Sequence, residues 1–292
     1  MSAFRIQTFV PLLKEHIQIK ELKNADYLDL VKCIDKGDNE IISEAFENLI
    51  QEQIVNKDVI GKLTIIGKVV VLLEIYRHFI HETIDFSVTA YENEGTRFSV
   101  GIESIIDELN KVDYNLISEH VEISDGVELF FSLPSSLYVK QRDILTDIIY
   151  TIFSETNKYY FHTFNREEQI LFLDSITTPI IKPASDAIES INEDIGKIKF
   201  IKKVENVELE EVECGLFTNE MFFFMKALFS ADMYDIYMKQ YFMIKILGSD
   251  YDHYLKIPPM EVSTMTRLYE SDRKEQEKQL QKEQQGVNTY KE

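Results

Sequence analysis

The chain has 292 residues, of which 45% are hydrophobic, and its 51 acidic side chains outnumber 31 basic ones, giving a formal net charge of −20 at pH 7. This length allows one large domain or two modest ones. The negative charge argues against general nucleic-acid binding, because phosphate would be repelled over most of the surface. It fits either an acidic cytosolic protein or a protein with a basic partner.

Cysteine content and the apolar segments bear on the cellular compartment. Cys33 and Cys214 lie in unrelated contexts, so we expect neither a disulfide framework nor a zinc site, and reduced thiols in the cytosol are the default. The N-terminus has no basic stretch before a long apolar run, which predicts no secretory signal. Charged residues such as Lys68 and Glu74 interrupt the longest apolar stretches, so we expect no membrane span.

The beginning of the chain predicts a hairpin followed by a helix. Alternating apolar residues at Ile6–Val10 and Ile17–Ile19 indicate two short strands that can pair. Capping residues precede a helix near Tyr27–Ile34, and Gly37 is placed to end that helix.

Two further helices are predicted before residue 80. Asp38 or Asn39 can cap a helix that runs to about Ile54 and keeps its apolar residues on one face. The next segment, Leu63–Phe79, is apolar nearly all round, which is typical of a buried helix. We therefore expect it at the centre of the fold.

Short strands dominate the prediction for the middle of the chain. Alternation and turn signals favour two hairpins, with strands at 84–88 and 98–100, and at 121–123 and 127–131. A short helix is expected at 102–109. The segment 144–153 is apolar and fits either a helix or a strand, and Asn165 can cap a helix that runs to Ile176.

The last part of the chain mixes helices with one more hairpin. After a link at 177–183 we expect, in chain order, a helix at 186–195, strands at 198–204 and 207–212, an aromatic helix from Thr218 or Asn219, a helix at 231–247 and a last helix from Pro259. The fold class predicted is α+β, helix-rich with several short antiparallel hairpins and a C-terminal helical segment. The expected domains are an N-terminal α+β domain at 1–176, a helical region with a small hairpin at 184–258, and a terminal helix with a polar tail at 259–292.

Methionines and aromatic residues concentrate near the C-terminus. All but the first of the eight methionines fall between Met221 and Met265. Such a segment forms either a well-filled core or an adaptable binding surface. Helical spacing assigns one stripe of each helix to the core: Phe222, Met225 and Phe229, then Ile236, Tyr237, Tyr241 and Ile244. The remaining large apolar groups imply either that these helices are central in the fold or that the surplus contacts another chain.

The last helix is apolar only in its first part, at Val262, Met265, Leu268 and Tyr269. Beyond Glu270 the composition still favours a helix, with pairs such as Arg273 and Glu277, but only Leu280 is apolar. This part is either a solvated helix that frays or a helix that a partner orders.

Catalytic and metal-binding motifs are missing from the sequence. There is no phosphate-binding glycine loop and no hydrolase nucleophile motif. His78 and His81 lack a third ligand at a recognisable spacing, and the segment 35–40 matches a calcium loop only in composition and suits a joint between helices. Four acidic residues are interpreted as a solvated strand edge: Glu208, Glu210, Glu211 and Glu213. We assign no catalytic, cofactor-binding or metal residue, and expect no cofactor.

Several segments resemble the baseplate protein family of T4-like contractile-tailed phages, which comprises baseplate hub and hub-assembly components. The opening strand at Ile17–Leu22, the paired helices around a Gly-Asp joint at Leu30–Ile54 and the buried helix ending in arginine at Leu63–Arg77 carry this resemblance. It continues through a β-rich region at Thr83–Pro134 and returns in the helix and charged terminus that follow Pro258.

The resemblance implies a non-enzymatic phage tail protein of the baseplate hub, either a structural subunit or a hub-assembly chaperone. Its partners would be phage tail or baseplate hub proteins, without nucleic acid or membrane, and a homo-oligomer is left open. It would be found in the host cytoplasm during assembly, or in the virion as part of the tail baseplate. The alternatives are a viral host-interacting or regulatory binding protein, and an enzyme without a recognisable motif.

Under this interpretation, partners contact apolar residues that the core does not use. The predicted partner-binding residues lie on the two aromatic helices and on the last helix: Phe223, Phe224, Tyr241, Phe242, Met243, Met265 and Leu268.

Overall fold

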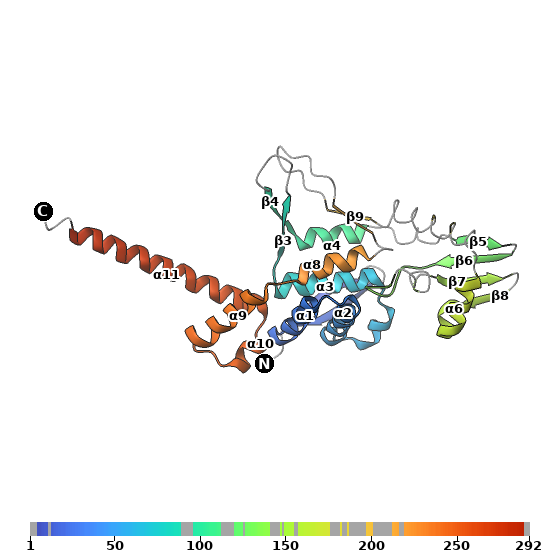
Figure 1. The fold of residues 1–292 in the computed structure, drawn as a ribbon, viewed down its shortest axis with the longest axis horizontal. Coiled ribbons are helices and arrows are strands. Elements are labelled where there is room, and N and C mark those ends of the chain that lie inside the picture. Colours follow the sequence, from blue (N-terminus) through green and yellow to red (C-terminus); the bar gives the residue numbers. More distant parts are fainter. Residues whose placement is uncertain are drawn as a thin grey trace.

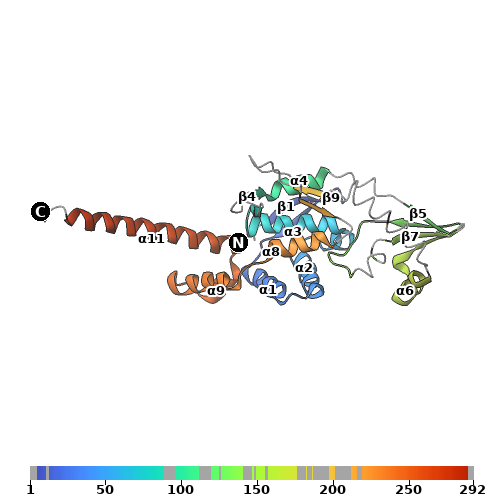
Figure 2. The same cartoon turned by 45° about the horizontal axis from the view of Figure 1, so that its top comes forward.

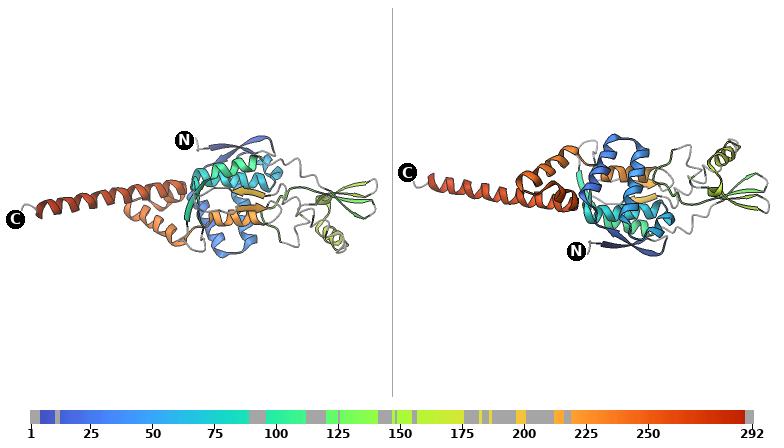
Figure 3. Two further views of the ribbon diagram at one scale, coloured as in Figure 1. Left: turned by 90° about the horizontal axis from the view of Figure 1, so that it is seen from above. Right: turned by 90° about the horizontal axis from the view of Figure 1, so that it is seen from below.

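A computed structural model of the chain (Figure 1) describes residues 5–10, 13–88, 96–111, 120–124, 126–140, 147, 149–154, 157–175, 182, 186, 197–200, 212–215 and 219–288. The described elements are arranged along one long axis (Figures 1 and 2). A central body lies between a strand-rich region at one end and a helical projection at the other, and views from above and below agree on this arrangement (Figure 3).

The central body is built around α3 (Ile65–Phe79), in which eleven of fifteen residues are buried, as predicted for a helix that is apolar nearly all round. Three helices of the body pack against it: α2 (Asn39–Gln53), α4 (Ile102–Lys111) and α8 (Glu220–Phe229). A fourth, α1 (Asn24–Lys36), packs against α2 and α8. A short 3-10 helix, η1 (Lys57–Lys62), leads from α2 into α3.

The joint between α1 and α2 follows from two local residues. Gly37 ends α1 with φ +80°, a left-handed conformation that glycine adopts without strain. Asp38 then caps α2, because its carboxylate accepts hydrogen bonds from the backbone N–H groups of Glu40 and Ile41. Both predicted capping roles are confirmed.

A hairpin of β1 (Arg5–Val10) and β2 (Glu15–Lys20) covers one side of the body. The strands pair antiparallel, and their buried positions alternate with exposed ones, as predicted. Gly67 on α3 allows β1 to approach closely, since a Cβ there would lie 2.9 Å from Leu63 Cδ2 and 3.2 Å from Val10 Cγ1. The backbone N–H of Val55 also donates to Gln18 at 2.9 Å, which ties the hairpin to the end of α2.

Two more hairpins adjoin the body. The strands β3 (Thr83–Val88) and β4 (Thr96–Gly101), which lie between α3 and α4 in the sequence, pair antiparallel as expected. The strands β9 (Lys197–Phe200) and β10 (Val212–Gly215) also pair antiparallel, and they contact α4 and α8 respectively. The helix predicted at 186–195 and the acidic residues at 208–211 lie outside the described part of the chain, apart from Asp186.

The strand-rich end is a four-stranded antiparallel sheet in chain order, formed by β5 (His120–Ser124), β6 (Val127–Phe131), β7 (Ile149–Ser154) and β8 (Asn157–Tyr160). The ambiguous apolar segment therefore contributes a strand, β7. The turn η4 (Phe161–Thr163) leads into α6 (Arg166–Ser175), where Asn165 caps the helix as predicted. The Asn165 side chain accepts from the Glu168 N–H, and the Glu168 carboxylate accepts from the Asn165 N–H.

The helical projection begins after α8. Here α9 (Met233–Tyr241) continues into a π-helical turn, η5 (Phe242–Ile246), which is followed by α10 (Tyr251–Lys256) and α11 (Pro259–Asn288). Pro259 begins α11 as predicted. In Figures 1, 2 and 3, α9 lies beside the base of α11, whose far part extends away from the body.

The observed architecture confirms the α+β class with antiparallel hairpins and a C-terminal helical segment. The predicted domain boundaries at 176 and 184 lie outside the described residues. One cluster of buried side chains nevertheless includes residues from both sides of that gap. Phe229 of α8 packs edge-on against Phe46 and Tyr76, at centroid distances of 5.4 Å in both cases. Among the described helices, none is long and apolar enough to cross a membrane.

Candidate protein-binding surface

The outer face of α9 carries a row of exposed large side chains. Tyr234, Tyr237, Met238 and Tyr241 are 67%, 56%, 48% and 57% exposed. Their spacing of three, four and seven residues from Tyr234 places them on one face of the helix. We call these four residues the α9 stripe. Tyrosine and methionine are enriched in protein interfaces and adapt to different partners.

The opposite face of α9 is fixed to the rest of the projection. Ile236 is buried, and so are Phe242 and Met243 in the following π-helical turn. The Phe242 ring packs edge-on against Tyr269 of α11, with a centroid distance of 5.0 Å. Lys239 Nζ donates to Ser263 Oγ at 3.2 Å. The stripe therefore stands on a helix whose inner face is held in place by packing.

Further exposed apolar residues follow the stripe along the chain. Ile246, Leu247 and Tyr251 are 47%, 43% and 49% exposed, and they lead from η5 into α10. Scattered exposed apolar residues are ordinary on a protein surface, but a concentration in one region is typical of an interaction site.

The helix α11 changes character along its length. Val262 is buried and Tyr269 is partly buried, so the first turns pack against the projection and the end of α3. Every residue from Glu270 to Gln281 is exposed. The helix continues to Asn288. An isolated helix of such polar composition is only marginally stable in water.

The predicted partner-binding residues differ in accessibility. Tyr241, Leu268 and Phe223 are exposed, at 57%, 59% and 48%. Phe224 and Met265 are partly buried against the core. Phe242 and Met243, at 8% and 2% exposed, are enclosed within this chain and cannot serve as surface contacts in this conformation.

These residues do not form one continuous site. Phe223 belongs to α8 and contacts Tyr138, at a ring-centroid distance of 6.5 Å. Tyr241 and Leu268 lie instead on α9 and α11, in the helical projection.

The core stripe predicted for α8 is confirmed, but that for α9 is wrong in part. Phe222, Met225 and Phe229 are buried, whereas Tyr237 and Tyr241 are exposed. Sequence reasoning missed Tyr234, Tyr237 and Met238 as surface residues. Their helical spacing was the available signal, because it defines a second apolar face that one buried stripe does not explain.

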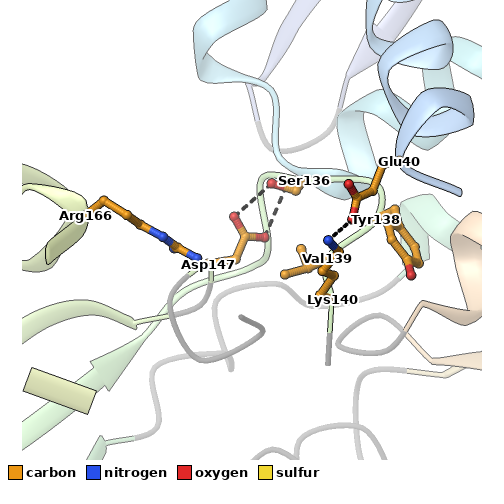
Figure 4. Close-up of a pocket in the computed structure, with 7 residues that line it drawn as sticks. All are labelled: Glu40, Ser136, Tyr138, Val139, Lys140, Asp147 and Arg166. Carbon is orange, nitrogen blue, oxygen red and sulfur yellow. Dashed lines mark hydrogen bonds and ion pairs between the residues drawn. The ribbon is translucent and has the colours of Figure 1, made fainter. Parts of the chain in front are cut away.

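A polar pocket of about 400 Å³ lies between the body and the four-stranded sheet. Figure 4 shows Glu40, Lys140, Ser136, Asp147 and Arg166 around it. Glu40 forms an ion pair with Lys140. The Asp147 carboxylate accepts hydrogen bonds from the Ser136 hydroxyl at 3.0 Å and the Ser136 N–H at 3.2 Å.

The Glu40–Lys140 ion pair and Asn219 hold the segment 132–140 to the body, while Asp147 joins the same segment to the region just before β7. The Asn219 side chain accepts from the Val139 N–H at 3.1 Å and donates to the Val139 carbonyl at 2.7 Å. The Ile65 N–H donates to the Pro134 carbonyl at 2.8 Å. The pocket is therefore lined by groups that fasten the sheet region to the body.

Neither surface carries an arrangement typical of a metal centre. Within the described ranges, no group of three or more His, Cys, Asp or Glu side chains could hold a metal ion. His78 Nε2 lies 3.4 Å from Glu74 Oε2, and His81 Nδ1 interacts with Thr83. The segment 35–40 forms the joint between α1 and α2. What the α9 stripe supplies is apolar and aromatic contact area.

Comparison with known proteins places the chain in a family. A search of curated proteins gave no match, and neither did a search of solved structures. A family model described as T4 bacteriophage base plate protein matches residues 1–224, out of 292. The match covers the body and the four-stranded sheet and ends within α8, so the α9 stripe, α11 and the segment from Pro258 lie outside it. Because the match extends over well more than half of its length, the chain belongs to the T4 bacteriophage base plate protein family.

Proposed function

We propose that this baseplate protein belongs to the hub, as a structural subunit or as a chaperone of hub assembly, and that it acts without catalysis by binding other tail proteins. The observation that carries the proposal is the α9 stripe. Four large exposed side chains on a helix with a packed inner face suit a protein-binding surface. The exposed part of α11, which leaves the body near α9, extends this surface.

The net charge of the chain indicates what kind of partner it would bind. A formal net charge of −20 opposes nucleic-acid binding and also association between copies of the chain, while it favours approach by proteins with basic surfaces. We therefore propose phage tail or hub proteins as partners, met in the host cytoplasm during assembly.

The stripe is tested by substitution in a phage that encodes a tagged full-length chain. The double substitution Tyr237→Asp and Tyr241→Asp places charge on the stripe. Both residues are more than half exposed, so the variant is expected to fold. We expect the variant to lose tail proteins that the wild-type chain captures after cross-linking in infected cells, as identified by mass spectrometry. The control is Leu171→Asp on α6, where an apolar residue that is 69% exposed lies on a different region of the molecule.

Two outcomes would contradict the proposal. If the stripe variant captures the same tail proteins as the wild-type chain, the stripe is not part of the interface. Recovery of host proteins and no tail proteins by the wild-type chain would favour the host-interacting alternative.

Mass spectrometry of purified virions separates the two hub roles. A structural subunit remains in the virion, whereas an assembly chaperone is absent from it.

A further inference from the structure

A groove of about 510 Å³ lies where α11 leaves the body, and the α9 stripe does not contribute to it. Its apolar lining comes from Phe79 at the end of α3, from Pro258, and from Met265 and Leu268 on α11. Phe79 is buried, Met265 is partly buried and Leu268 is 59% exposed. The lining is therefore graded from an enclosed floor to an open rim, which suits insertion of an apolar side chain.

Two carboxylates line the same groove, and neither is paired with a lysine or arginine among the residues that the structure describes. Glu21 follows β2, and Glu261 lies in the first turn of α11. Neither forms an ion pair with any residue of the described chain, although the exposed Lys20 and Lys23 flank Glu21 in sequence. The pKa of the Glu21 carboxyl is raised, first by partial burial and second by the charge of Glu261. A cation at this position would stabilise the ionised form of Glu21 and so offset both its burial and its repulsion by Glu261.

His78 does not supply that cation. Its Nε2 lies 3.4 Å from Glu74 Oε2, so the carboxylate nearest to its ring is Glu74. The groove thus joins an apolar floor to an uncompensated negative edge.

We propose that this groove binds a basic amphipathic segment of a partner protein, with an apolar side chain between Phe79 and Met265 and with lysine or arginine facing Glu21 and Glu261. The proposal deepens the proposed function, on which it rests for the source of the partner, by giving the chemistry of the bound segment. Charge complementarity selects this occupant. A second copy of the chain is disfavoured, because each copy carries a net charge of −20.

The groove can be tested with a designed peptide and full-length protein. The probe is a fluorescent helical peptide with one leucine flanked by lysines and arginines, and its counterpart has glutamate in place of every basic residue. We expect the basic peptide to bind, the acidic peptide not to bind, and the affinity of the basic peptide to fall as salt rises. Fluorescence anisotropy measures each affinity.

Variants locate the binding site. Leu268→Asp, at an exposed position, is expected to weaken the basic peptide by about tenfold or more. The double substitution Glu21→Lys and Glu261→Lys is expected to reverse the charge preference of the groove, so that the acidic peptide binds better than the basic one. Leu171→Asp, at an exposed position on α6, is the control and leaves peptide affinity unchanged. Thermal unfolding confirms that each variant is folded.

The outcomes decide between the two proposals as well as within this one. Absence of basic-peptide binding, or an unchanged preference in the lysine variant, would overturn the groove proposal. A dimer in sedimentation that depends on Leu268 would also overturn it, since a second copy would then be the occupant. If the peptide binds as expected while tail proteins are not captured from infected cells, the groove stands and the proposed function fails.

Discussion

Glu74 is a buried carboxylate that connects β1 to α3. It is 8% exposed, and its Oε1 accepts a hydrogen bond from the Thr8 hydroxyl at 3.0 Å. Its Oε2 lies 3.4 Å from His78 Nε2 and 3.8 Å from Arg77 Nη1. A buried carboxylate is costly unless it is paired, so the stability of the fold is expected to be sensitive to changes at Glu74 and its three partners.

We predict that Glu74→Ala lowers the free energy of unfolding by about 2–3 kcal/mol, because it leaves the buried Thr8 hydroxyl without its acceptor and removes buried contacts. Urea denaturation measures the change. The matched control is Glu103→Ala, which removes an exposed carboxylate 3.6 Å from the same Arg77 and should cost less than about 0.5 kcal/mol. Equal losses in the two variants would contradict the importance of burial at Glu74.

Tyr27 is expected to control part of the stability at high pH. Burial, together with the neighbouring Tyr76, raises the pKa of Tyr27 from 10.0 to about 12. The phenol is neutral when protonated, so the unfolded chain ionises first as the pH rises. This contribution is therefore complete below pH 10 and is lost as the pH approaches 12, by up to about 3 kcal/mol.

The prediction for Tyr27→Phe is a shallower decline of stability over that range. Urea midpoints measured from neutral pH upward should fall less steeply in the variant than in the wild-type chain. The decline that remains is assigned to Tyr76 and Tyr254, whose pKa values are also raised by burial. Identical slopes in the two proteins would show that Tyr27 ionises equally well in the folded chain.

Among the elements, α8 separates core from surface most clearly. Phe229 is fully buried and packs on Phe46 and Tyr76, whereas the adjacent face carries Phe223 at 48% exposure. We predict that Phe229→Ala costs about 3–5 kcal/mol through loss of burial and formation of a cavity. Phe223→Ala should cost about 1 kcal/mol, because the ring is half exposed and loses edge contacts with Phe222 and Tyr138. Denaturant midpoints compare the two, and similar losses would contradict this division of the helix.

Elements whose signals are local were predictable from the sequence. The α1–α2 joint follows from Gly37 and Asp38, and the buried helix α3 follows from an apolar surface that has no polar side. The assignment of β7 did not follow, because a short apolar run fits a buried helix or a strand until its neighbours are known.

The candidate surface was predictable only in part, and α9 shows why. Its sequence has two apolar faces, one through Ile236 and one through Tyr237 and Tyr241, and periodicity does not say which face is buried. The π-helical turn adds a second difficulty. There the Leu247 N–H donates to the Phe242 carbonyl, five residues earlier, so residues after Tyr241 leave the α-helical spacing. Phe242 and Met243 are consequently buried, although the sequence predicted them among the exposed partner-binding residues.

At the scale of the molecule, the family match and the candidate surface occupy different parts of the chain. Residues 1–224 carry the family match, while the α9 stripe and α11 follow it. The two parts remain joined by packing, since α11 contacts α3 and the core cluster includes residues of the projection. A change in the exposed part of α11 should therefore separate binding from folding.

We predict that a chain ending at Glu270 keeps the stability of the full chain, because it retains Tyr269 on Phe242 while the described residues removed, up to Gln281, are exposed. A chain ending at Pro258 should lose about 3 kcal/mol or more, since it also removes the buried Val262 and the Tyr269 ring. Thermal and urea unfolding compare the two truncations. The shorter deletion should nevertheless weaken capture of tail proteins, because it removes the projecting helix without altering the body. If that chain is destabilised as much as the one ending at Pro258, the outer part of α11 contributes to folding, and unchanged capture would exclude it from the interface.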